Sequence, residues 1–511
     1  MSGRSKAHDV GGCSAFNDAL RLPGVPPHMA EDWFMRESRK GSRVPDSSGR
    51  RGRRLPHFTA ALLAGLCAVL RLAAAPAEPA SIAHTSPPWL RESVIYEVFP
   101  RAFSKEGNLN GVTAKLDELK DLGVTVIWLM PIHPIGLEQR KGAYGSPYAA
   151  RDYYAVSPDY GTKADLKRLA AEAHQRGLKV LLDVALLHTA WDSVLMAHPD
   201  FYRHNAQGKI IPPVPEWNDV AALNYDNPAL RQYLIAMLEY WVTETDVDGF
   251  RCDTASMVPT SFWEEARAAL AKTKPDLLML AEADKPELLV KAFDIDYAWP
   301  LLNTVRDVLG KSAPASAIRR TWENELRRYP AGALRLTMSD NHDQARAVAC
   351  FGVSGALAAS ALMFTLDGVP LLYNGMEVGD ATESGDPALF EKVPVFWQPK
   401  GRPPLPEIYR SLIKLRKQYA AFRSPSVHWL RNSEESALLT YLRADERDEF
   451  LVVINFGNRP LHATVDLQNG DSFVPVKIAG VQYSNNAPCP DLQLNGFEWR
   501  IYHRSASVAA R

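Results

Sequence analysis

Three acidic residues stand where strand-like segments end, and their type and placement suit chemistry on a sugar. Asp253 closes the segment DGFRCD, Glu282 closes LLMLAE, and Asp343 closes SDNHD. Each lies at or just after an apolar run typical of a buried strand, and helical periodicity separates the runs. In a barrel of parallel strands, the carboxyl ends of the strands converge on one site. Carboxylates held together there suit retaining glycoside cleavage, in which one is the nucleophile and another the acid/base.

Eight apolar runs are the strands that we predict to position these acids. Their near-continuous apolar character is typical of parallel strands buried on both faces. Amphipathic segments at 112–123 and 163–177 between them each end at glycine, the expected helix stop. This alternation predicts an α/β fold, a (β/α)8 TIM barrel. The predicted strands are 94–99, 124–130, 179–186, 249–253, 277–283, 293–298, 334–340 and 369–375.

The chain divides into three predicted parts. Residues 1–88 are predicted to be an N-terminal extension with a signal peptide, largely disordered, and residues 89–424 the catalytic barrel. The stretch 189–226 after the third strand is predicted to form a short inserted subdomain, because long loops on the catalytic face are usually functional. Beyond residue 425, alternating strands at 437–443, 449–457 and 462–467 predict a C-terminal antiparallel β-sandwich over 425–511.

Composition argues against several classes of partner and cofactor. The 511 residues carry a formal net charge of −1, with 23% charged residues. That balance gives no electrostatic reason to expect nucleic acid or an anionic membrane as a partner. The five cysteines match no zinc or redox spacing and no dense disulfide framework.

The first eighty residues contain the pattern of an export signal. A basic flank with RRGRR at 50–54 precedes the apolar stretch 59–70 and the small residues of 72–80. The apolar stretch is short for a membrane span, and cleavage after Ala77 or Ala75 fits a secretory signal. The chain is therefore expected to be secreted or periplasmic, with no membrane partner after processing. The alternative is an uncleaved membrane anchor.

Six segments in order resemble the α-amylase family of retaining glycoside hydrolases, glycoside hydrolase family 13, across roughly residues 90–505. The similarity lies on the predicted strand ends and their loops. Because the matches are several and in order, they are far more specific than any one of them. The segments are GSPYAARDYYAVSPDYGT (145–162), DVALLH (183–188), GFRCD (249–253), the strand ending at Glu282, NHD (341–343) and GVPLLYNGME (368–377).

The resemblance implies distinct roles for the three acids. Asp253 would be the nucleophile that forms a covalent glycosyl-enzyme, and Glu282 the acid/base that protonates the leaving oxygen and then activates water. Asp343 would bind the 2- and 3-hydroxyls of the sugar. Arg251 precedes the nucleophile by two residues and so points to the same side of its strand, where its charge should lower the pKa of Asp253. Taken alone, this pair would more simply be a structural ion pair of the barrel.

Four further residues are assigned to substrate binding or support by the resemblance. His188 and His342 would donate hydrogen bonds to sugar hydroxyls, and Asp183 would support the site from behind. Tyr148 would be the platform beneath the sugar, although Tyr144, Tyr153 and Tyr154 are close competitors in the same loop.

Two departures from the family pattern limit what can be carried over. The family usually has an asparagine that binds calcium just before the first histidine, and here that position is Leu187. Leucine offers no oxygen ligand, so no metal and no cofactor are expected. Ala255 and Ser256 replace the Lys-His pair that binds glucan on the leaving-group side, which leaves the specificity open.

The sequence thus predicts hydrolysis of α-1,4-glucosidic bonds in starch-type glucans or malto-oligosaccharides with retention of configuration. Transglycosylation by the same acids is an open alternative, because the two reactions differ in the acceptor and not in the catalytic residues. A non-catalytic carbohydrate-binding relative is the alternative from another class. Such a relative would be expected to lack one or more of the acids, and here all three are present.

Overall fold

The computed structural model describes residues 81–506 apart from 400, 402, 484 and 486–488. The predicted signal peptide, its cleavage positions and the basic flank before it lie outside the described residues. So does the proposal of an uncleaved anchor at 59–70.

Eight parallel strands close into a barrel in the order β1-β10-β9-β8-β7-β6-β3-β2. Each of the eight predicted barrel strands is confirmed, and none of these eight extends beyond its predicted run. Alternate residues such as Ile95, Trp128 and Leu280 pack with one another in the interior of the barrel, and their neighbours pack against the helices. The strands are β1 (Ile95–Val98), β2 (Val126–Leu129), β3 (Lys179–Val184), β6 (Gly249–Cys252), β7 (Leu278–Ala281), β8 (Ile295–Tyr297), β9 (Leu334–Thr337) and β10 (Val369–Tyr373).

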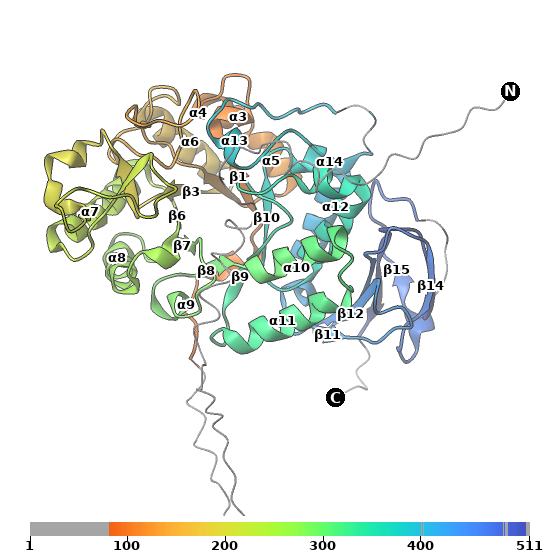
Figure 1. Cartoon of the computed structure of the whole chain (residues 1–511). Coiled ribbons are helices and arrows are strands. Elements are labelled where there is room, and N and C mark those ends of the chain that lie inside the picture. The colour runs from red at the N-terminus through yellow and green to blue at the C-terminus, as the bar shows by residue number, and fades with distance from the viewer. Residues whose placement is uncertain (1–80, 400, 402, 484, 486–488, 507–511) are drawn as a thin grey trace, which may run out of the picture. The chain divides into compact units, whose positions relative to one another are not determined.

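Helices surround the strands, as Figure 1 shows. Short helices in the loops are α3 (Pro100–Phe103), α4 (Leu109–Thr113), α9 (Leu288–Lys291) and α13 (Asp386–Leu389). The longer helices are α5 (Leu116–Leu122), α6 (Lys163–Gln175), α7 (Pro228–Thr245), α8 (Thr260–Thr273), α10 (Trp299–Gly310), α11 (Ser316–Arg328), α12 (Ala347–Thr365) and α14 (Leu405–Gln418).

The prediction of one continuous helix over 112–123 is wrong. The chain forms two helices there, α4 and α5, separated by Ala114 and Lys115. Helix α4 packs against α3 and α6, whereas α5 packs against α14. The two helices thus pack against different neighbours, and an apolar repeat in the sequence does not reveal where one ends and the other begins.

Among the described residues, α12 is the one helix long and apolar enough to cross a membrane, with a mean hydropathy of 1.9. It packs against α10, α14 and strand β13 (Asp448–Asn455). Its apolar character is therefore accounted for by burial within the protein.

The inserted subdomain after β3 is built on a two-stranded antiparallel sheet. Strand β4 (His188–Ala190) pairs with β5 (Val220–Ala222), and short 3-10 turns occupy the stretch between them. The prediction of a short insertion is confirmed, and its first strand begins at a predicted site residue, His188.

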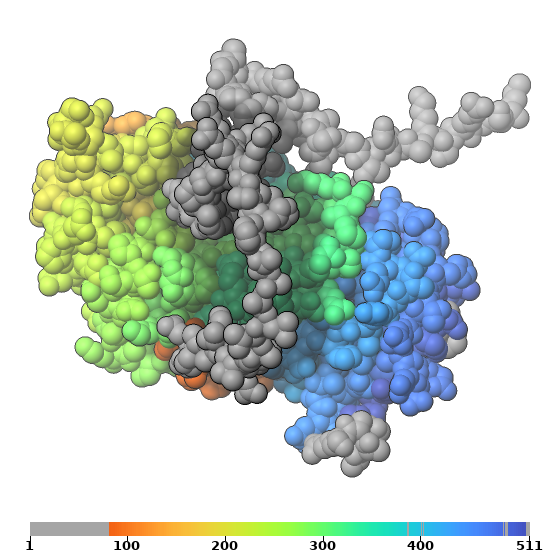
Figure 2. Space-filling view, turned by 60° about the horizontal axis from the view of Figure 1, so that its bottom comes forward, coloured from red at the N-terminus to blue at the C-terminus, as the bar shows by residue number. Residues whose placement is uncertain are grey.

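Two antiparallel sheets follow the barrel, which confirms the predicted C-terminal β-sandwich. A five-stranded sheet has the order β11-β12-β13-β17-β15, and β14 pairs with β16. Side chains of both sheets meet in one core, for example Leu451 of β13 and Leu492 of β16. In Figure 2 this part, in blue, lies beside the green part of the barrel. The remaining strands are β11 (His428–Trp429), β12 (Leu438–Ala444), β14 (Leu461–Thr464), β15 (Val474–Pro475), β16 (Asp491–Leu494) and β17 (Trp499–Ser505).

Candidate active site

Two of the predicted acids meet at one guanidinium group at the mouth of the barrel. Asp253 follows β6 directly, Glu282 follows β7 directly, and Arg251 lies on β6 between them in space. Arg251 Nη1 donates to Asp253 Oδ1 at 2.9 Å, and Nη2 lies 3.1 Å from Glu282 Oε2 without hydrogen-bonding geometry. The same arginine therefore holds the first carboxylate firmly and the second loosely.

Arg251 is fully buried and its other partners fix its orientation. Its Nη1 also donates to Asp183 Oδ1 at 2.9 Å, and its Nε donates to the hydroxyl of Tyr297 at 3.2 Å. The guanidinium lies over the rings of Trp128 and Tyr148, with centroid distances of 5.0 and 5.6 Å. Because these contacts hold its planar guanidinium, Arg251 keeps a fixed position relative to Asp253 and Glu282.

Thr254 also donates a hydrogen bond to each of the two acids. Its backbone N–H donates to Glu282 Oε2 at 2.7 Å, and its hydroxyl donates to Asp253 Oδ2 at 3.2 Å. Thr254 has a φ of 44°, in the left-handed region that non-glycine residues seldom adopt. The sharp turn after β6 thus directs both groups of one residue at the two carboxylates.

The third acid, Asp343, lies in the loop after β9 beside His342. The Nε2 atom of His342 is 3.2 Å from Asp343 Oδ1 and 2.7 Å from the hydroxyl oxygen of Tyr148. Tyr148 in turn donates to Asp183 Oδ2 at 3.1 Å. A continuous chain of contacts therefore joins Asp343 to Arg251 through His342, Tyr148 and Asp183.

Tyr148 is the tyrosine of its loop that enters the site. Its ring stacks on that of His342, with a centroid distance of 5.6 Å. Tyr144 is exposed beneath Arg101, Tyr153 donates to backbone carbonyls, and Tyr154 packs edge-on against other tyrosines. The structure therefore separates Tyr148 from the competitors that the sequence left open.

His188 lies apart from the chain of contacts that joins the other predicted residues. It is buried on β4, and its ring packs edge-on against Trp217 of the insertion at 5.9 Å. Its Nδ1 atom has no hydrogen-bond partner among the described residues. Burial lowers the pKa of His188 to about 4, so the ring is neutral at physiological pH.

Burial sets the protonation of the two acids that share Arg251. It raises the pKa of Asp253 to about 6 and that of Glu282 to about 7, against the opposing charge of Arg251. As expected, the charge of Arg251 lowers the pKa of Asp253, but burial has the larger effect, so the net pKa is raised. Arg251 is shared by Asp183, Asp253 and Glu282, and burial outweighs the effect of its charge on the pKa of each.

Asp343 differs from the other two acids. Burial acts to raise its pKa, but the charge and hydrogen bond of His342, together with Arg251, lower it overall. Its side chain is also the most exposed of the three, at 33% against 17% for Glu282 and 10% for Asp253. Asp343 is thus an ionised carboxylate open to a ligand.

Three residues of the site were missed by the sequence analysis. Trp128 donates its Nε1–H to Asp183 Oδ2 at 3.1 Å, Tyr297 accepts from Arg251, and Glu97 bonds to Nδ1 of His342. Glu97 and Trp128 lie inside apolar strand runs, and Tyr297 is the last residue of β8. A buried glutamate in the middle of a strand was the one signal available, because a charge in such a run needs a partner.

The loop after β2, which carries Tyr148, is held on both sides. Lys141 Nζ lies 2.9 Å from Asp219 Oδ1 in the inserted subdomain. On the other side, the N–H of Ala143 donates to Glu391 Oε1 at 3.0 Å, and the N–H of Tyr144 donates to the carbonyl of Phe390 at 2.9 Å. The loop therefore links the insertion after β3 to the segment after β10 along one side of the barrel mouth.

Comparison with known proteins agrees with this geometry. The family model for the alpha amylase catalytic domain matches residues 79–205 and 216–386. The alpha-amylase MalA of Haloarcula japonica is 30% identical over 76% of this chain, which spans 58% of that relative's length. A cyclomaltodextrinase from a Bacillus species is 27% identical over 72% of this chain and 73% of its own length.

Two solved structures show the same architecture at comparable identity. The noncanonic maltogenic alpha-amylase AmyB from Thermotoga neapolitana superposes with a TM-score of 0.74 at 32% identity, covering 82% of this chain and all of its own. An alpha-amylase from Lactobacillus plantarum gives a TM-score of 0.72 at 30% identity, covering 81% of this chain and 99% of its own. With the barrel, the three acids and the family match in agreement, this chain belongs to the α-amylase family of glycoside hydrolases.

Proposed function

We propose that this enzyme hydrolyses α-1,4-glucosidic bonds in starch-type glucans or malto-oligosaccharides with retention of configuration. The observation that carries the proposal is that Arg251 donates a hydrogen bond to Asp253 but only lies near Glu282. Asp253 is bound by a charged hydrogen bond, as a nucleophile that must stay ionised requires. Glu282 is held more loosely and has the higher pKa, as a proton donor requires.

The proposed reaction has two steps. Asp253 attacks the anomeric carbon, the bond to the leaving oxygen breaks, and Glu282 gives that oxygen its proton. Glu282 then takes a proton from water, whose oxygen attacks the anomeric carbon and releases Asp253. Asp343, His188 and His342 hold the hydroxyls of the transferred sugar, Tyr148 lies beneath its ring, and Asp183 and Arg251 support them.

Incubation with maltoheptaose tests this function. The purified protein should release shorter malto-oligosaccharides, and Asp253→Asn should lower kcat by roughly 10⁴-fold or more, the scale for loss of a nucleophile. Asp276→Asn is the matched control, because Asp276 is an exposed aspartate just before β7. Undiminished cleavage by Asp253→Asn would refute the assignment of the nucleophile. Products longer than the substrate would favour the transglycosylase alternative.

We also propose that the enzyme needs no calcium. Leu187 is 6% exposed and packs in the main apolar core at the position where the family has its calcium-binding asparagine. An apolar side chain there offers the cation no oxygen. Thermal unfolding with and without EDTA should therefore give the same Tm, within about 1 °C. A clear drop in Tm on chelation, reversed by added calcium, would contradict this proposal.

Export is proposed from the sequence of residues 50–80 alone. Expression of the full chain in a bacterial host, followed by N-terminal sequencing of the mature protein, tests it. A start at residue 76 or 78, with activity outside the cytoplasm, is the expected result. An intact N-terminus with activity inside the cells would contradict it.

A further inference from the structure

Glu97 is a fully buried carboxylate on β1 that faces the interior of the barrel. It shares its side of the strand with Ile95, two residues earlier, which packs in the interior core. One of its oxygens, Oε1, bonds to Nδ1 of His342, and the other has no hydrogen-bond partner among the described residues. A carboxylate is costly to bury when only one of its oxygens is bonded, so the single bond of Glu97 to His342 points to a role for this pair.

The partners of His342 define which of its nitrogens carries a proton. Tyr148 uses its one hydroxyl proton to bond to Asp183, so its oxygen can only accept from His342 Nε2 at 2.7 Å. The carboxylate of Asp343, 3.2 Å from the same nitrogen, likewise can only accept, since its pKa is lowered. Both neighbours therefore require a proton on Nε2.

A neutral imidazole with its proton on Nε2 has a bare Nδ1 that needs a donor. The group facing Nδ1 is Glu97, so one further proton lies in the Glu97–His342 bond. That proton belongs either to an imidazolium facing a carboxylate or to a neutral imidazole facing a carboxylic acid. A carboxylate opposite Nδ1 accepts from an Nδ1–H, so with Nε2 also protonated Glu97 favours the imidazolium, which donates from both nitrogens.

We propose that Glu97 is a positioning residue of the active site: its carboxylate keeps His342 protonated on both nitrogens, so that Nε2 donates toward Tyr148 and Asp343 and orders them. The inference rests on the proposed function, in which those two side chains hold the transferred sugar. Without the charge of Glu97, the ring loses its second proton more readily, and a neutral ring can present a bare nitrogen to Asp343, which would turn attraction into repulsion.

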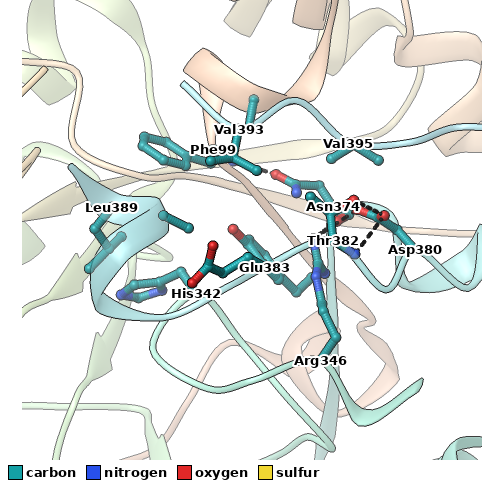
Figure 3. A pocket seen from close by; sticks show the side chains of 13 residues that line it. Phe99, His342, Arg346, Asn374, Asp380, Thr382, Glu383, Leu389, Val393 and Val395 are labelled. Atoms are coloured by element: carbon teal, nitrogen blue, oxygen red, sulfur yellow. Dashed lines mark hydrogen bonds and ion pairs between the residues drawn. The ribbon is translucent and has the colours of Figure 1, made fainter. Parts of the chain in front are cut away.

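The surroundings of His342 support a shift in its titration when Glu97 is neutralised. Its pKa is raised well above the ordinary value, because the charges of Asp343 and Glu97 together outweigh burial, which acts to lower it. A small cavity of about 10 Å³ lies beside the ring, and Figure 3 shows its lining. The titratable groups that surround the ring are Glu97 on β1, Asp183 on β3, Arg251 on β6, Tyr148, Asp343, and Arg346, Tyr373, Asp380 and Glu383 around the cavity.

Glu97→Gln tests the inference through kinetics. Removing the charge should lower kcat/KM by roughly 10- to 100-fold, the range for losing a hydrogen bond to a charged group. Because the variant removes a negative charge beside the ring, His342 should lose its second proton at a lower pH than in the wild type, as measured from its ¹⁵N resonances. Glu377→Gln is the matched control: Glu377 is a buried carboxylate bonded to Tyr96 at 2.6 Å, and its neutralisation should leave kcat/KM and the titration of His342 unchanged.

The wild-type enzyme gives a second test that needs no folded variant at position 97. The ¹⁵N resonances of His342, assigned by comparison with His342→Gln, should show a proton on both ring nitrogens from pH 6 to 8. A neutral ring in that range, or a Glu97→Gln enzyme in which kcat/KM and the titration of His342 are those of the wild type, would overturn the inference. If the wild type cleaved no glucan, the proposed function would fail, while the ¹⁵N measurement would still decide the role of Glu97.

Discussion

Arg251 shows how one buried side chain can give two similar carboxylates different tasks. Asp253 receives a direct hydrogen bond from it, whereas Glu282 lies near it without one and is held by the backbone of Thr254. Burial raises the pKa of both acids against the opposing charge of Arg251, to about 7 for Glu282 and about 6 for Asp253. The difference favours the state in which Asp253 is ionised and Glu282 protonated.

The pH dependence of kcat/KM should follow from this difference. Activity should rise as Asp253 loses its proton near pH 6 and fall as Glu282 loses its proton near pH 7, which gives a narrow bell. The two limbs report apparent values of the coupled pair. Initial rates at low substrate concentration between pH 4 and 9 measure the profile. A flat profile from pH 5 to 9 would contradict it.

The roles of the two limbs can be separated with Glu282→Gln. The variant has no proton to lose at this position, so the alkaline limb should disappear. Its remaining activity should be greatest on an aryl α-glucoside, whose leaving group needs little protonation. An alkaline limb that persists in Glu282→Gln would assign that limb to another group.

At the residue scale, sequence reasoning located the acids and missed their support. Asp253 and Glu282 stand directly at strand ends, where position alone reveals function in a barrel. Glu97, Trp128 and Tyr297 lie within apolar runs, and their partners are 46 to 245 positions away in the chain. Contacts across a barrel interior depend on which strands face each other, and hydrophobic periodicity does not encode that.

At the element scale, an ion pair and two hydrogen bonds connect the loop after β2 to the insertion after β3 and to the segment after β10. Lys141→Ala should release it from Asp219 in the insertion and so loosen the loop that carries Tyr148. Because Lys141 is one-third exposed, the effect should be small, with KM for maltoheptaose rising by no more than about fivefold. Steady-state kinetics measure this, with Lys209→Ala as the control at an exposed lysine of the insertion. A change in kcat without a change in KM would contradict this role of the Lys141–Asp219 ion pair.

Arg416 connects three elements at the opposite end of β10. Arg416 of α14 is buried and donates to the carbonyls of Leu366, Gly368 and Phe422, which join α12, β10 and the segment after α14. Arg416→Met would leave these carbonyls without their donor, at about 1–3 kcal/mol each. Urea unfolding should show a loss of about 3 kcal/mol or more, with kcat/KM of the folded enzyme unchanged. Arg410→Met, an exposed site on the same helix, should cost little.

Strands were predicted more reliably than helices in this chain. The eight barrel strands are short, apolar and separated by turn residues, so the sequence marks them clearly. The 112–123 segment has a helical repeat throughout, but tertiary packing divides it, because α4 and α5 contact different partners. Local periodicity predicts a helix, but it does not show where packing against the rest of the protein ends one helix and begins the next.

At the scale of the whole molecule, barrel and sandwich share a core. Phe450 and Ile454 of β13 belong to the same apolar cluster as residues of α12 and α14, such as Leu362 and Leu412. The sandwich therefore stabilises the barrel by burying part of its helical surface. The proposed catalytic acids lie at the carboxyl ends of the strands, so we expect loops at that end, and not the sandwich, to determine what the enzyme binds.

The anomeric configuration of the first product tests the account most directly. A double displacement through Asp253 inverts the anomeric carbon twice, so the sugar released from maltoheptaose must first appear as the α-anomer. Proton NMR in the first minutes, before mutarotation, distinguishes the two anomers. Initial α-product is the predicted result. Initial β-product would contradict the assignment of Asp253 as the nucleophile and Glu282 as its acid/base.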